Sequence, residues 1–210
     1  MSSAILPDLG DALDAVLRGR RSIRSYADRP VPPDVLERVL DAARHAPSPH
    51  HSVPWRFAVL VGQSTKEQLA RAMGDRWRAD LAGDGVPPEQ IEAEVAKSHR
   101  RLTRAPVVLV GCLYLDPLDE YPDPSRQRAE ELMAAHSLGT ALQNVMLAAH
   151  ANGLASCWMC APVFCPEVVR DAVGLDRALL PHALITLGYA AKAPPARERP
   201  SLDDIVALRA

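Results

Sequence analysis

The sequence predicts an α+β fold in which helices sandwich a mostly antiparallel or mixed sheet. Several segments repeat apolar residues every three to four positions, as amphipathic helices do, and short apolar runs between them have the length of buried strands. The glycine-rich turn that follows the first strand of a Rossmann fold is absent, which argues against a doubly wound dinucleotide fold. With 210 residues, no internal repeat and no long linker, the chain is predicted to form a single domain, residues 1–210.

Residues that start or stop helices bound the helical segments. Apolar residues over 9–17 follow helical spacing, and Gly19 is suited to the end of that helix. A Ser-x-x-Glu sequence at 64–67 has the form of a capping box. The longest segment has few charges after Glu131 and is expected to be the central buried helix. The predicted helices are 9–17, 33–43, 64–81, 88–103, 126–152 and 166–173.

The strands are predicted from apolar runs bounded by turn residues. The run 106–115 (PVVLVGCLYL) is apolar throughout, as in an interior strand covered on both faces. Prolines make 46–54 a loop. Beyond the last strand the tail is rich in proline and arginine, and Leu202, Ile205 and Val206 are expected to anchor it to the body. The predicted strands are 57–61, 106–115, 154–159 and 182–190.

Charge and composition favour a small-molecule partner. Lys and Arg number 24 against 26 Asp and Glu, a net charge of -2, so nothing indicates binding to nucleic acid or to an acidic membrane surface. No run reaches the roughly 18 to 20 apolar residues of a membrane span, and acids stand near the N-terminus where a signal peptide needs a basic and then an apolar stretch. We therefore expect a cytoplasmic protein whose 4 cysteines are reduced.

A basic segment comes directly after the first predicted helix. It reads Arg20, Arg21, Ser22, Ile23 and Arg24. Guanidinium groups and a hydroxyl so close together can surround a phosphate with charge-assisted, bidentate hydrogen bonds. The alternative is a solvated basic turn near acids such as Asp28.

The proline-rich loop 46–55 displays Ser48, His50, His51 and Trp55. Such a stiffened loop can hold polar groups against a flat ring. Metal binding by the two histidines is disfavoured, because adjacent side chains point apart and neither helical spacing nor a carboxylate supports them. No metal site is expected.

Cys157 and Cys160 form a C-x-x-C pair, with Cys165 further along. This spacing occurs in thioredoxin-type redox motifs and in one half of a zinc site. A second pair is absent, however, and the cysteines lie on a predicted strand rather than at a helix start. Buried structural cysteines are the favoured interpretation.

The order of these motifs along nearly the whole chain resembles the nitroreductase family. That family's Arg-x-Ser-x-Arg/Lys motif matches 20–24, its proline-bounded loop matches 47–55, and its G-L-x-S-x-W strand matches 153–158. Its central helix and its G-Y turn match 137–152 and 188–189. The resemblance implies a nitroreductase-like α-β-α sandwich and a homodimer that binds FMN at its interface.

The resemblance also implies which residues contact FMN. The family usually has a glycine at the position of Cys160, so a backbone contact is expected there rather than a thiol contact. The last phosphate-binding arginine falls at Arg197 or Arg199, between which spacing does not choose. The implied contacts are Arg20, Arg21, Ser22, Ile23, Arg24, Ser48, Cys160 and one of Arg197 and Arg199.

The proline-rich loop departs from the common pattern, because His51 and Val53 stand where the family often has Asn and Gln. Together with the segments 73–81 and 84–85, this loop resembles the corresponding parts of the C-terminal reductase domain of the bifunctional coenzyme F420 ligase of actinobacteria. That resemblance implies FMN-dependent hydride transfer to the C=C bond of dehydro coenzyme F420-0, which gives coenzyme F420-0 in deazaflavin biosynthesis. Asp80 would contact the deazaflavin. The glutamate ligase half is absent, so a separate ligase is an expected partner.

Other functions stay open from the sequence. A broad-substrate NAD(P)H nitroreductase or quinone reductase would use the same cofactor. A non-catalytic module that binds flavin or deazaflavin would fit the lack of an assigned proton donor, for which His50 and His51 are the nearest candidates and solvent is the alternative. A flavin-fragmenting enzyme that builds the lower ligand of cobalamin is disfavoured by the His-His loop.

Overall fold

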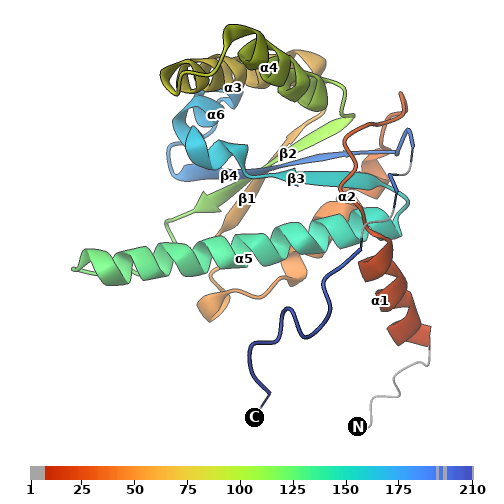
Figure 1. The fold of residues 1–210 in the computed structure, drawn as a ribbon. Helices are drawn as coiled ribbons and strands as arrows, with labels where there is room; N and C mark the ends of the chain where they lie inside the picture. The colour runs from red at the N-terminus through yellow and green to blue at the C-terminus, as the bar shows by residue number, and fades with distance from the viewer. Residues whose placement is uncertain (1–7, 193, 196–197, 210) are drawn as a thin grey trace.

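The described residues fold around a four-stranded antiparallel sheet. A computed structural model describes residues 8–192, 194–195 and 198–209. The strands are β1 (Trp55–Leu60), β2 (Val107–Tyr114), β3 (Ala155–Met159) and β4 (Leu179–Gly188). They pair in the order β1–β2–β4–β3, which leaves β1 and β3 at the edges (Figure 1). The prediction of a mixed or antiparallel sheet is thus confirmed in its antiparallel form.

Helices cover both faces of this sheet and complete an α-β-α sandwich. The helices are α1 (Asp8–Gly19), α2 (Pro33–Asp41), α3 (Gln63–Gly83), α4 (Pro88–Thr103), α5 (Pro124–Ala151) and α6 (Pro166–Val173), with 3-10 turns η1 (Ala42–His45), η2 (Pro49–His51) and η3 (Ala161–Phe164). In Figure 1, α3, α4 and α6 lie above the sheet and α5 crosses below it. Helices α1 and α2 contact α5 and share its side of the sheet. The predicted α+β class and layered architecture are confirmed.

Successive side chains of β2 point to opposite faces of the sheet and pack against both helical layers. Leu109 belongs to the core cluster that contains Leu142 of α5, whereas Val108 belongs to the cluster that contains Leu69 of α3. Successive strand residues point to opposite faces, so a run that is apolar throughout buries its side chains on both sides. Each such aliphatic side chain stabilises the fold by about 1.5–3 kcal/mol relative to leaving it exposed.

The structure corrects three predictions about the start of α3, the place of β1 and the tail. Helix α3 begins at Gln63, and its N-cap is Gly62 without a side-chain cap, so the predicted capping box is wrong. Strand β1 is an edge strand that starts at Trp55 and is buried mainly at its two ends. Leu202 and Ile205 are 68% and 64% exposed, so the expected anchoring of the tail to its own body is also wrong.

Among the described residues, no helix is long and apolar enough to cross a membrane.

Gly188 at the end of β4 lies against the Pro106 ring and the Tyr26 side chain. A Cβ there would stand 2.6 Å from Pro106 Cδ and 3.0 Å from Tyr26 Cδ1. Because the proline ring is rigid, Gly188→Ala should lower the free energy of unfolding by about 1–3 kcal/mol, measured by urea denaturation. Gly83→Ala is the control, since nothing lies within 4 Å of the place where its Cβ would stand. Equal stability of the two variants would contradict this close packing.

Candidate functional site

The basic segment 20–24 follows α1 and runs along the free edge of β3. Ser22 forms a parallel bridge with Ser156, and the Ile23 N–H donates to the Ser156 carbonyl at 2.9 Å. The segment therefore extends the sheet at the edge that β4 does not occupy. The side chains of Ser22 and Arg24 are exposed there.

Tyr26 fixes this segment to the sheet. Its hydroxyl oxygen lies 2.7 Å from the Ile23 carbonyl, 3.0 Å from the Thr186 carbonyl and 2.7 Å from Thr186 Oγ1. Burial raises the pKa of Tyr26, so the phenol stays neutral and keeps its proton for donation to a carbonyl. The Ala27 N–H continues the attachment by donating to the Tyr189 carbonyl at 2.8 Å.

Positive charge gathers around Cys157 in the middle of β3. Burial raises the pKa of the Cys157 thiol, while Arg24, Arg101 and Arg20 act in the opposite direction by favouring the thiolate. Arg101 comes from α4, far from the basic segment in sequence, and so was not predicted. The three guanidinium groups give this edge of the sheet a positive potential that suits an anionic ligand.

A pocket of about 210 Å³ opens beside the basic segment, where Arg20, Arg21, His150 and Ser156 contribute to its lining. The hydroxyl of Ser156 is buried and has no hydrogen-bond partner among the described residues. A buried polar atom without a partner costs about 1–3 kcal/mol, so this hydroxyl is suited to a ligand. The sequence did not single out His150, because its neighbours in the chain are apolar.

The same pocket shows why Gly19 ends α1. A Cβ on Gly19 would stand 2.5 Å from His150 Nε2, so a larger residue there would require the His150 side chain to move. Arg21 folds back and donates from Nη1 to the carbonyls of Arg18 and Arg20, which satisfies acceptors at the helix end. The Arg21 guanidinium is therefore largely committed to the backbone of its own segment.

The Ser48 loop forms a separate site over α5. Ser48 lines a pocket of about 330 Å³ together with Met133, His136 and Thr140. The Ser48 hydroxyl accepts a hydrogen bond from the Val53 N–H at 3.0 Å. None of the residues that line this pocket lines the pocket beside the basic segment. A single chain thus leaves the two predicted parts of the site apart.

The same loop stores backbone strain. His50, His51 and Val53 have φ angles of 52°, 54° and 45°, in the left-handed region that residues other than glycine rarely adopt. Strain of this kind costs about 1–3 kcal/mol per residue and persists only where the surroundings enforce it. His50 and His51 are exposed, and neither side chain forms a hydrogen bond within the described chain.

The predicted substrate residue Asp80 belongs to a surface network of charges. Arg76 Nε lies 3.0 Å from Asp80 Oδ1, and Arg76 Nη1 lies 3.1 Å from Glu167 Oε1. Asp80 also contributes to the charges that act on Cys165, near the start of α6. The Asp80 carboxylate is therefore oriented by Arg76 at the surface between α3 and α6.

The cysteines and the last arginines complete the predicted set. All 4 cysteines are free thiols. Cys157 and Cys165 are buried, but Cys160, at the start of η3, is exposed, so the expectation of a buried cysteine is wrong there. Burial raises the pKa of Cys112 to about 12, which makes its thiol unreactive at neutral pH. Arg197 lies outside the described residues, and Arg199 is exposed. The described residues contain no cluster of His, Cys, Asp and Glu arranged to hold a metal ion.

Tyr26→Phe tests the attachment of the basic segment. Removing the hydroxyl leaves the buried Thr186 Oγ1 and the Ile23 carbonyl without this partner. The free energy of unfolding should fall by about 1–3 kcal/mol, measured by urea denaturation. Tyr189→Phe is the matched control, because its ring packs under Arg29 at 3.8 Å and its hydroxyl carries no comparable contact in the described chain. A loss no greater than in the control would show that the hydroxyl does not hold the segment.

Known proteins share this fold and about a quarter or less of the aligned residues. A family model described as the nitroreductase family matches residues 17–189. A nitrobenzene nitroreductase of Ectopseudomonas oleovorans is 27% identical over 199 residues, which cover 85% of this chain and 86% of the relative. A BluB-like flavoprotein from Clostridium difficile 630 superposes with a TM-score of 0.80 at 19% identity, covering 94% of this chain and 99% of the other.

The FMN-dependent nitroreductase NfnB from Mycobacterium smegmatis, solved in complex with NADPH, superposes with a TM-score of 0.71 at 23% identity, covering 97% of this chain and 100% of the other. At these identities the two structures bear on the fold alone. The family model spans most of the chain, from the end of α1 to the turn after β4. This protein therefore belongs to the nitroreductase family.

Proposed function

We propose that this protein is an FMN-dependent oxidoreductase whose cofactor lies along β3. The observation that carries the proposal is the basic segment on the β3 edge, next to a pocket lined in part by Ser156, whose buried hydroxyl has no partner among the described residues. Guanidinium and hydroxyl groups in this arrangement suit a phosphate dianion. Reduced FMN, when bound, supplies a hydride for the reduction of an organic substrate.

The residues present fit FMN at both of its ends. Arg20, His150 and Ser156 line the pocket that would hold the phosphate. Cys160 lies four residues further along the chain from Ser156, about 13 Å away at the usual rise of a strand. The residue is exposed, and its backbone would contact the ring. Arg24 lies between these ends and would hold the polar edge of the ring.

Further residues of the predicted set complete the site in this proposal. One of Arg197 and Arg199 would add a guanidinium group from the tail. Ser22 and Ile23 would contact the cofactor from the segment that Tyr26 holds in place. Arg21 would act mainly by fixing the end of α1 next to the pocket.

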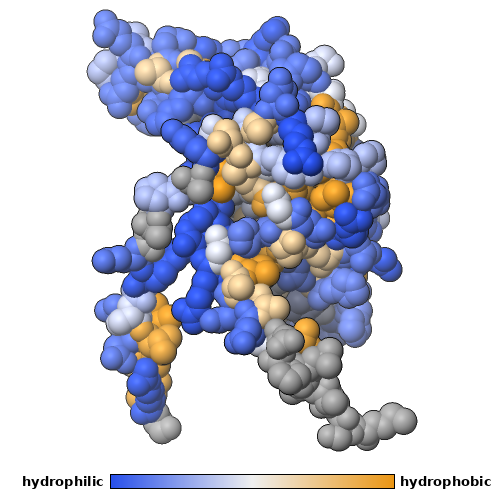
Figure 2. All heavy atoms as spheres, turned by 90° about the vertical axis from the view of Figure 1, so that its right-hand side faces the viewer, coloured by the Kyte–Doolittle hydropathy of each residue, from blue (hydrophilic) through white to orange (hydrophobic). Residues whose placement is uncertain are grey.

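A homodimer would bring the two separate parts of the site together. Leu9 and Leu13 of α1 are 57% and 56% exposed, and the tail exposes Leu202, Ile205 and Leu208. Figure 2 shows the tail standing away from the body at the lower left, with apolar side chains along it. Apolar surface of this kind is typical of a face that another chain covers. In the proposed dimer a second copy supplies Ser48 to the flavin, and the tail packs on that copy.

For the substrate, we propose dehydro coenzyme F420-0, whose reduction adds a hydride and a proton across its C=C bond. Support comes from the resemblance of the His50–His51 loop and of the segment around Asp80 to the deazaflavin-forming reductase domain. The Asp80 carboxylate, oriented by Arg76, would hydrogen-bond the deazaflavin. His50 or His51 would donate the proton, since both are exposed, and a separate glutamate ligase would act on the product.

The alternative substrates are nitroaromatic compounds or quinones, with NAD(P)H as the electron donor. The activity for which the Ectopseudomonas oleovorans relative is named favours this alternative. A module that binds flavin or deazaflavin without turnover is the third candidate function.

The phosphate pocket predicts selective losses of affinity. Arg20→Ala and His150→Ala should each weaken FMN binding about tenfold or more, because a hydrogen bond to a charged group contributes about 1.5–3 kcal/mol. Riboflavin, which lacks the phosphate, should bind these variants as it binds the unaltered protein. Flavin fluorescence titration measures both affinities. His45→Ala, an exposed histidine that pairs with Asp41, is the control. Equal losses for both flavins would remove the phosphate assignment.

Turnover distinguishes the proposed substrates. After anaerobic reduction of the FMN-loaded protein, dehydro coenzyme F420-0 should restore the absorbance of oxidised flavin faster than nitrobenzene does. Asp80→Asn should raise KM for the deazaflavin about tenfold, as expected for a hydrogen bond to a charged group, and leave FMN affinity unchanged. Gln68→Ala on the same helix is the control variant.

Each other outcome selects a different function. Reoxidation by nitrobenzene alone would establish the nitroreductase alternative. Flavin that is bound but ignored by every acceptor would indicate a binding module. Destruction of the flavin itself when reduced protein meets air would indicate the flavin-fragmenting chemistry, which the His-His loop disfavours.

A further inference from the structure

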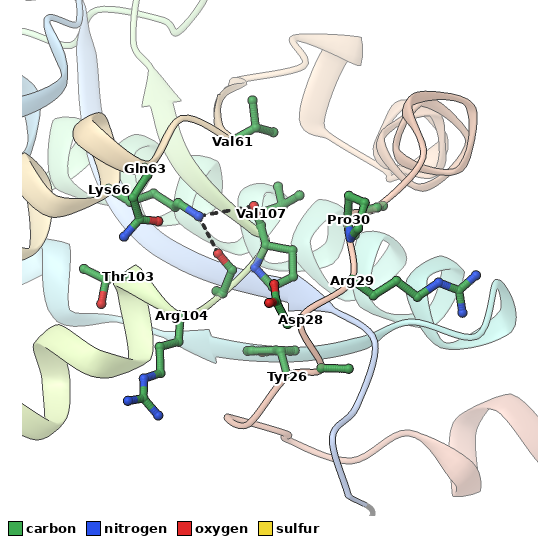
Figure 3. Close-up of a pocket in the computed structure, with 14 residues that line it drawn as sticks. Tyr26, Asp28, Arg29, Pro30, Val61, Gln63, Lys66, Thr103, Arg104 and Val107 are labelled. Carbon is green, nitrogen blue, oxygen red and sulfur yellow. Dashed lines mark hydrogen bonds between the residues drawn. The ribbon is translucent and has the colours of Figure 1, made fainter.

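A second group of polar and apolar side chains forms a pocket apart from the proposed flavin site. Its volume is about 600 Å³, and it opens between the segment after Tyr26, the start of α3, the end of α4 and the start of β2 (Figure 3). Tyr26 contributes its ring to this pocket. None of the predicted FMN contacts lines it.

The charges in this pocket are unbalanced. Lys66, Arg29 and Arg104 supply positive charge against the single carboxylate of Asp28. Among the described residues, none of these three cations lies within 4.0 Å of a carboxylate oxygen. Arg29 is held over the Tyr189 ring at 3.8 Å, whereas Arg104 is exposed and free to reorient. In Figure 3, Arg29 and Arg104 extend outward on opposite margins of the group of side chains.

Lys66 is the unusual member of the group because it is buried. Only 5% of its surface is exposed, and Nζ donates to the carbonyls of Ala105 at 2.7 Å and Pro106 at 3.4 Å. An ammonium group has three protons to donate, so one is left for another acceptor. Burial lowers the pKa of Lys66, and the nearby charge of Glu67 acts in the opposite direction.

The start of α3 adds to this positive potential. Gly62 offers no side-chain cap, and the first turn of α3 contains no acidic residue. The backbone N–H groups at a helix start carry partial positive charge, and a lysine there is less favourable than an anion. Glu67, the next residue along the helix, accepts a hydrogen bond from Gln63, and its charge acts on Lys66 without forming an ion pair within 4.0 Å.

The remaining walls are apolar. Pro30, Val31, Val61 and Val107 line the pocket beside the charged groups. In Figure 3, Val61, Val107 and Pro30 lie on one side of Lys66. A site with this combination of walls favours an apolar body that carries one anionic group.

We propose that this pocket binds a small organic carboxylate with an apolar body of about one ring. The carboxylate accepts hydrogen bonds from Lys66 and Arg104, and the body packs on the valine and proline side chains. This site is independent of the flavin and of any reaction at it.

The chain offers a specific probe, because it contains only the lysines Lys66, Lys97 and Lys192. We would label the lysine ε-carbons with ¹³C and add benzoate to protein saturated with FMN. We expect benzoate to change the chemical shift of the Lys66 resonance in a saturable way and to leave the Lys97 and Lys192 resonances unchanged. Benzyl alcohol tests the need for charge, and inorganic phosphate tests the need for the apolar body.

Substitution of Arg104 tests its part in binding, and substitution of Arg100 is the control. Arg104→Gln should weaken benzoate binding about fivefold, the upper range for one exposed charge interaction, without affecting folding. Arg100→Gln removes an exposed arginine one turn earlier on α4 and should change nothing.

Three results would overturn the proposal. If benzoate leaves the Lys66 resonance in place, the pocket binds no such anion and Lys66 serves only the two carbonyls. If benzyl alcohol binds as well as benzoate, the charges do not select the ligand. If phosphate binds as well as benzoate, the apolar walls contribute nothing and the assigned ligand class is wrong.

Discussion

The attachment of Tyr26 to β4 is the interaction on which both pockets depend. Its hydroxyl joins the Ile23 carbonyl to Thr186, a residue that is 1% exposed in the middle of β4. Gly188 leaves the space that the Tyr26 ring and Pro106 occupy. This attachment holds the basic segment against β3. On its other side, Tyr26 forms part of the wall of the pocket that contains Lys66. A single buried phenol therefore links the positions of two separate groups of cations.

The proposed flavin site is divided within one chain. The basic segment lies on an edge strand, whereas Ser48 lies over α5 in a different pocket. The strained φ angles of His50, His51 and Val53 show that the second part is held in a conformation that the residues alone do not favour. A second copy of the chain, packed on the exposed leucines of α1 and of the tail, would explain both the division and the strain.

Sequence patterns predicted the elements better than they predicted the contacts between elements. The apolar periods of α5 and β2 gave their type and place because burial on a helix face or on both faces of a strand dictates the pattern. The capping box failed because α3 begins one residue before Ser64. His150 and Arg101 were missed, since each acquires its role from segments that are distant in sequence. The predicted attachment of Leu202 failed because apolar character does not say which surface will cover it.

By itself, the sequence determined the α+β class, the helices and strands, and the resemblance to the nitroreductase family, through motifs that are each a short stretch of neighbouring residues. Local spacing suffices for these because helix and strand periods are properties of neighbouring residues. Only the tertiary structure decided that Ser156 is buried without a partner, that His150 joins Arg20, and that Lys66 is enclosed beside an unbalanced set of charges. Burial and long-range electrostatics depend on which elements pack together, and that is decided by the whole fold.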